Sequence, residues 1–271
     1  MAIRLRDRQS MPWMQPGGKL ITMSSAAMKW TGLLLTCLSS FGAAILQRGL
    51  LKLDSYASLD DLLAAAPDPA SGAMSLVSWT ITCSLISAMA IPLYAKLLYE
   101  GWKRAASRKP LLKRLALCAL LSDLPFNLAM NGAALDFDVQ CPVWGLLVCA
   151  VMLEVLRMPK PQSRILSGFV QVLTVAGALA WTLLLRIYMG PTMVLLVAMF
   201  YFLEGHKLVS MLGGAMLTMP QFPAPLGMLF AYWYEPNEEK DAKFPNLFYI
   251  LYPAQLLVFG IAGMLLAGLT A

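Results

Sequence analysis

The sequence predicts an all-α protein, a polytopic transmembrane helical bundle of about eight spans. Charged residues make up only 13% of the chain, against roughly a quarter in soluble domains, while apolar residue types reach 59%. The apolar segments are as long as the roughly 20 residues that a membrane helix needs, and they lack the short alternating pattern of barrel strands. We therefore expect a lipid bilayer around the chain, and no nucleic acid as a partner.

The first part of the chain is a basic segment, residues 1–27, which has no long apolar run. We expect this segment in the cytoplasm, and we expect residues 28–271 to form a single transmembrane domain. The first apolar run, residues 28–47, has the length of an uncleaved membrane anchor. After a polar loop rich in aspartate, residues 75–99 form the second predicted span, in which Pro92 predicts a kink.

The remaining apolar runs complete the predicted bundle. They cover residues 111–130, 142–156, 165–187, 190–203, 208–234 and 244–269. The run at 208–234 is interrupted by the sequence PQFPAP, and its prolines also allow a broken or re-entrant helix.

The charges between the spans predict how the bundle is oriented. The connection at residues 100–114 is rich in Lys and Arg, which short cytoplasmic loops collect. The loop at residues 235–243 is net acidic, and we place it outside. With this loop outside and the basic connection inside, eight spans put both ends of the chain in the cytoplasm. The predicted location is a bacterial cytoplasmic membrane.

Cysteine and histidine usage excludes several classes of site. The five cysteines form no C-x-x-C pair, and His206 is the only histidine, so we expect neither a disulfide framework nor a metal site. We interpret His206 as a solvated residue at the cytoplasmic end of a span, although it is also the only conventional general base in the chain.

An unusual group of polar residues lies in the apolar stretch LLSDLPFNLAMNG, residues 120–132. Asp123, Asn127 and Asn131 are spaced four residues apart, so they share one side of a helix, and Pro125 opens that helix locally. A buried aspartate costs about 3 kcal/mol at mid-membrane on insertion scales, so it should pair, become protonated or line a wet cavity. Two interpretations remain open: a substrate cavity at the kink, or a polar contact that ties helices together.

Two stretches resemble the TraX family, membrane proteins named for pilin acetylation and related to acyltransferases. Residues 87–132 match the family's "EG" with a basic turn and its "ISEIPF(D/N)LAFNG" helix, while FPNLFYILYPAQLLVFGI, residues 244–261, is similar to its "FYxFYPxHL" helix. The matching residues in the first stretch are Glu100, Gly101, Pro125, Phe126, Asn127, Asn131 and Gly132. The resemblance implies acyl-coenzyme A as donor and a pilin or surface polymer as acceptor.

The departures from the family pattern fall on ionisable residues. Ser39 and Ser40 stand where the family has an aspartate and a histidine, and Ala88 replaces an arginine. Asp123 shortens a glutamate, and Gln255 replaces the histidine of the last helix. Because the family's presumed base is missing, the resemblance implies either a loss of acyl transfer or a rewired reaction.

From this comparison we predict Asp123 as the one candidate catalytic residue, acting as a base with a raised pKa. The predicted substrate-binding residues are Asn127, Asn131, Glu100, Ser39, Ser40 and Gln255.

Several functions remain open at this stage. A divergent TraX-like protein would be an inactive or rewired acyltransferase, a partner subunit, a regulator or a lipid- or acyl-donor-binding protein. A small-solute transporter or channel would use Asp123, Asn127 and Glu154 along its pathway, although the chain shows none of the inverted repeats typical of such proteins. A structural subunit of a larger membrane complex, with a protein partner or a second copy of the chain, is the third alternative.

Overall fold

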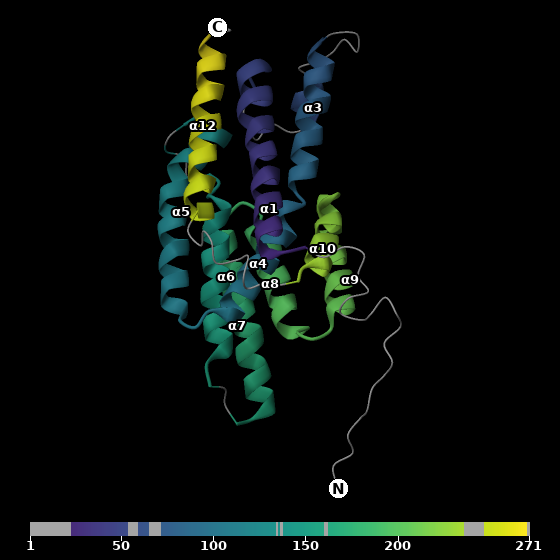
Figure 1. Cartoon of the computed structure of the whole chain (residues 1–271), viewed down its shortest axis with the longest axis vertical. Helices are drawn as coiled ribbons and strands as arrows, with labels where there is room; N and C mark the ends of the chain where they lie inside the picture. Colours follow the sequence, from purple (N-terminus) through teal and green to yellow (C-terminus); the bar gives the residue numbers. More distant parts are fainter. Residues whose placement is uncertain are drawn as a thin grey trace.

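The computed structural model describes residues 23–53, 59–64, 72–133, 135, 138–159, 162–235 and 247–269. The predicted basic segment falls almost wholly outside these residues, as does most of the predicted acidic loop. The described part is nearly all helical, which confirms the all-α class (Figure 1). Its elements are α1 (Ser25–Ser40), the π-helix η2 (Phe41–Leu50), α2 (Leu59–Ala64), α3 (Gly72–Ser87), α4 (Ala90–Arg104), α5 (Arg108–Met130), α6 (Pro142–Arg157), α7 (Arg164–Leu184), α8 (Gly190–Phe202), α9 (Lys207–Thr218), the short 3-10 helix η3 (Met219–Gln221), α10 (Ala224–Trp233) and α12 (Leu247–Leu269).

The chain has the helices of an integral membrane protein. Four helical stretches in the described residues are long and apolar enough to cross a bilayer: Ser25–Leu50, Gly72–Arg104, Arg164–Leu184 and Leu247–Leu269. The larger count of about eight spans stays a prediction. The predicted kink at Pro92 corresponds to a break, because α3 and α4 are separated by a turn just before that proline.

Helices α1 and α12 run parallel. The rings of Trp30 and Phe248 lie 5.1 Å apart near the beginnings of the two helices, and those of Phe41 and Phe259 lie 6.3 Å apart farther along. The end of α12 therefore lies at the same end of the bundle as the end of η2, as Figure 1 shows. The predicted layout, with both ends of the chain on one side, required the first and last spans to be antiparallel, so the structure corrects it.

The reason lies in the proline-rich segment between α9 and α10. There η3 and a cis Phe222–Pro223 peptide bond turn the chain, so that α9 and α10 pack against each other as a hairpin. These helices have 12 and 10 residues, about 18 and 15 Å, which is too short for a hydrocarbon core of ~30 Å. The hairpin brings the chain into α12 from the end where α1 begins, and the re-entrant form of this segment stays a prediction.

The core lies between α4, α6 and α8, where large apolar side chains such as Leu93, Leu153 and Leu196 are fully buried. Helix α7 covers the outside of this core and exposes most of its apolar surface. Ile165 and Leu184, near its two ends, are 87% and 74% exposed. A helix with so much apolar surface outside the core is suited to contact with lipid.

Candidate functional site

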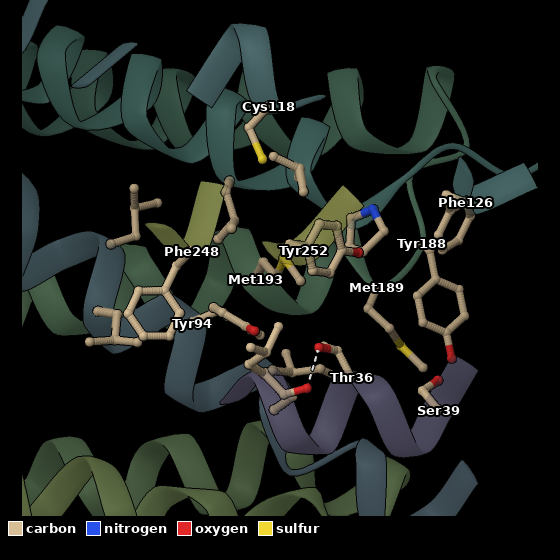
Figure 2. Close-up of a pocket in the computed structure, with 18 of the residues that line it drawn as sticks. Thr36, Ser39, Tyr94, Cys118, Phe126, Tyr188, Met189, Met193, Phe248 and Tyr252 are labelled. Carbon is tan, nitrogen blue, oxygen red and sulfur yellow. Dashed lines mark hydrogen bonds between the residues drawn. The ribbon is translucent and has the colours of Figure 1, made fainter. Parts of the chain in front are cut away.

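A cavity of about 300 Å³ lies in the middle of the bundle. Its wall is built mainly by α1, α4, α5, α6 and α12, together with the end of α3, the turn before α8 and the start of α8 (Figure 2). Most of the wall is apolar, with leucines from α1, α4 and α5 among the lining residues. This volume is at the lower end of the range for small-molecule sites in proteins.

Hydroxyl groups are the main polar feature of the wall. They belong to Thr36, Ser39, Ser40, Ser87, Tyr94, Tyr188, Tyr249 and Tyr252. Two of them donate to carbonyls of α1 itself: the Thr36 hydroxyl to that of Leu33 at 2.9 Å, and the Ser40 hydroxyl to that of Thr36 at 3.0 Å.

The Tyr94 hydroxyl lies near the side chain of Thr36. Tyr94 also packs against Gly32, where a side chain would come within 3.1 Å of its ring. The contact between α1 and α4 therefore holds this phenol at the cavity.

Tyr188 enters the cavity from the turn between α7 and α8. Its backbone N–H donates to the Gln140 carbonyl at 3.0 Å, which ties the turn to the beginning of α6. Its ring lies 6.3 Å from that of Phe126, and Figure 2 shows its hydroxyl directed toward that of Ser39. The next residue, Met189, has a positive φ of 56°, and this left-handed conformation starts α8.

Charge is scarce in the wall. Lys29, in the second turn of α1, is the only charged side chain among the described residues that line the cavity, and no carboxylate or histidine is among them. Its ammonium lies 6.0 Å from the centre of the Phe248 ring. The cavity thus has an apolar body, a set of neutral hydroxyls and a single cation.

The predicted site residues divide into two groups. Ser39 and Ser40 line the cavity, whereas Asp123, Asn127, Asn131, Glu100 and Gln255 are not among its lining residues. The lining residues of α5 are Leu111, Leu115, Cys118, Phe126 and Met130. At about 100° per residue Asp123 lies about 20° and 60° from Met130 and Phe126, at the edge of the lining side, and Asn127 and Asn131 lie progressively farther round the helix. The catalytic role of Asp123 and the binding roles stay predictions.

Helices α5 and α12 run side by side, and the contacts between them show which of their polar residues lie level with each other. Gly260 packs against Leu128 and Ala129, and the Cys118 thiol contacts the Tyr249 carbonyl at 3.6 Å. This register places Gln255 at the height of Asp123. The Oδ1 atom of Asp123 and both amide atoms of Gln255 are buried without a hydrogen-bond partner among the described residues.

The end of α5 is capped by a residue that the sequence did not single out. Nη1 of Arg48, in η2, donates to the Leu128 carbonyl at 2.8 Å. A cation is favourable here, because the end of a helix carries partial negative charge. Gly132 has a φ of +72°, and a Cβ on it would lie 1.8 Å from Cζ of Arg48. A positive φ and an arginine against the backbone explain why glycine follows Asn131.

Glu100 belongs to a group of ion pairs at the end of the bundle where α4 ends. It pairs with Lys96 at 2.8 Å and with Arg104 at 3.7 Å.

Glu154 accepts a hydrogen bond from Nε1 of Trp102 at 2.6 Å and pairs with Arg108 at 3.2 Å. Glu204 pairs with Lys103, whose hydrogen bond holds the pKa of Glu204 below its usual value. His206 is exposed beside this group, in agreement with the interpretation of a solvated histidine.

Comparison with known proteins adds one match. The family model described as TraX protein matches residues 24–262, which includes every helix described above except the last turns of α12. No curated protein and no solved structure matches the chain. The family model spans nearly the whole chain and agrees with the motifs in α4, α5 and α12. The chain belongs to the TraX family.

Proposed function

We propose that this TraX-family protein binds an acyl-bearing amphiphile in its central cavity and serves acyl transfer as a binding or partner component. The observation that carries the proposal is the composition of the wall, which is apolar with neutral hydroxyls and has no carboxylate or histidine among its described residues. An acyl chain would occupy the apolar body, and the hydroxyls would act as hydrogen-bond donors or acceptors for an ester or hydroxyl group.

The position of Asp123 argues against its use as the catalytic base. A general base must come within hydrogen-bond reach of the proton that it removes, about 2.6–3.2 Å or through one water. Asp123 is not among the residues that line the cavity, so a ligand there would contact its carboxylate only after a shift of the side chain or of the helix. The size of the cavity suits an acyl chain better than an entire acyl-coenzyme A, whose nucleotide would remain outside.

Filling the cavity tests the proposal. Leu33 lines it and is 8% exposed, whereas its neighbour Leu34 is 67% exposed and is not among the lining residues. We expect Leu33→Trp to lower the binding of a fatty-acid probe, such as cis-parinaric acid, at least tenfold in purified full-length protein. Leu34→Trp is the matched control and should bind as the wild type does. Equal binding by all three proteins would overturn the proposal.

Acyl transfer by the chain itself is the second candidate, and family membership is the observation that favours it. In vesicles supplied with acyl-coenzyme A and a surface acceptor, a chain that only binds should transfer no acyl group. Transfer that disappears with Asp123→Asn would instead establish Asp123 as the base and contradict the proposed role.

A further inference from the structure

Gly101 lies in the last turns of α4, and its packing does not require a glycine there. Glycine weakens a helix relative to alanine. A Cβ on Gly101 would meet nothing within 4 Å, and its φ is not in the left-handed region. Neither a close approach nor a special backbone conformation therefore requires glycine here. What distinguishes Gly101 is that it is exposed and also lines the cavity.

Three other lining residues lie at the same end of the bundle as Gly101. Lys29 lies in the second turn of α1, and Leu111 and Phe248 lie in the first turns of α5 and α12; all three helices begin where α4 ends. We call these four residues the portal. At the portal the cavity meets open space beside the missing side chain of Gly101, and the only charge in its wall is the Lys29 ammonium.

The surroundings of the portal are cationic. Lys103, Arg104 and Arg108, at the end of α4 and the beginning of α5, are held by Glu204, Glu100 and Glu154.

Other cations at this end are not compensated in this way. In the part of the chain that the structure describes, no ion pair is formed by Lys29, or by Lys109, Lys113 and Arg114 in the first two turns of α5. An anionic group that approaches this end would therefore be attracted toward it.

We propose that the portal admits a single-chain amphiphile with an anionic head group. Its head stays beside Lys29, and its chain extends past Leu33 and Leu115 toward the hydroxyls at Ser39 and Tyr188. The absent side chain of Gly101 leaves the passage open. This inference rests on the proposed function and adds the charge of the ligand and its route.

Closing the portal is the first test. Gly101→Leu would place a side chain in the passage without a clash, because the space beside Gly101 is open. We expect it to slow the association of cis-parinaric acid at least tenfold, measured by stopped-flow fluorescence on full-length protein. Gly177→Leu in α7 is the matched control, since its Cβ also meets nothing within 4 Å but it does not line the cavity. Association of the Gly101→Leu protein at the wild-type rate would overturn the route.

The head group is tested at Lys29. The wild type should bind cis-parinaric acid at least fivefold more tightly than its uncharged methyl ester. Lys29→Gln should remove the preference for charge, whereas Lys29→Arg and the control Lys109→Gln should keep it. A preference that survives Lys29→Gln would overturn the assignment of the head group to this lysine.

The two proposals fail in different ways. If Leu33→Trp binds the probe as well as the wild type does, the cavity is not the binding site and the proposed function falls. If Leu33→Trp abolishes binding while the Gly101 and Lys29 variants behave as the wild type, the cavity binds the probe but the portal does not admit it.

Discussion

Two sides of α5 differ in a way that explains where ligand binding should be sought. One side carries Asp123, Asn127 and Asn131, and Asn127 is only 2% exposed. The other side lines the cavity through residues such as Leu111 and Leu115, which in the sequence look like ordinary core. The polar side lies next to the capped end of the helix, whereas the apolar side borders space. Conspicuous polar residues in a span therefore need not line the space that the helices enclose, whereas inconspicuous apolar residues such as Leu115 do line it.

The capped end of α5 should give the largest effect on stability. Gly132→Ala must adopt a left-handed backbone and displace the Arg48 guanidinium from the Leu128 carbonyl. We expect a loss of about 2–4 kcal/mol in the free energy of unfolding. Thermal unfolding in detergent measures it, with Gly168→Ala in α7 as a control whose Cβ meets nothing. If Arg48→Ala destabilises Gly132→Ala as much as it destabilises the wild type, the two residues do not act together.

The cavity side of α5 should give the largest effect on ligand binding. Leu115→Trp fills space that the wild type leaves open, so we expect at least a tenfold loss of affinity for cis-parinaric acid, which corresponds to about 1.4 kcal/mol. Leu124→Trp, on the same helix but 51% exposed and outside the lining residues, should bind normally. A loss of the same size in both variants would mean that α5 affects binding only through the stability of the fold.

Gly101 should show opposite effects on stability and on binding kinetics. Gly101→Ala should raise the free energy of unfolding by roughly 0.5–1 kcal/mol, because alanine is the better helix former and meets no neighbour. The same change should slow association of the fatty-acid probe several-fold. If the variant is more stable and binds the probe as fast as the wild type does, Gly101 is not needed to keep a passage into the cavity open.

The smallest effect on binding is expected at Asp123. Asp123→Asn removes a charge from the polar side of α5 while keeping the shape of the side chain. We expect the affinity for cis-parinaric acid to change less than twofold, since Asp123 is not among the lining residues. A tenfold loss in an equilibrium titration would move the ligand to the polar side of the helix.

Composition and periodicity predicted the helical membrane class, and the motifs in α4, α5 and α12 predicted the family. Periodicity also placed Asp123, Asn127 and Asn131 together on one side of α5. It did not show which side borders the cavity, because that depends on how α1, α6 and α12 surround the helix.

The direction of α12 was predicted wrongly for a related reason. The segment from 208 to 234 is apolar enough for one span, but in the structure it forms short helices joined by a tight turn. The sequence allowed both a single span and a segment broken at its prolines. The roles of Arg48 and Tyr188 were missed because each depends on a contact distant in sequence. Gly101 offered a local signal, an unneeded glycine inside a helix, but its meaning depends on the cavity beside it.

The location of a bound acyl chain tests the central claim most directly. A palmitic-acid analogue with a diazirine on its chain can be photolysed on the full-length protein, and its adducts mapped by mass spectrometry after proteolysis. We predict adducts on lining residues, chiefly Leu33, Leu98 and Leu115, that excess palmitate prevents and that Leu33→Trp reduces. Adducts confined to outward-facing residues such as Leu120 and Leu124, unchanged by palmitate, would contradict a ligand site in the cavity.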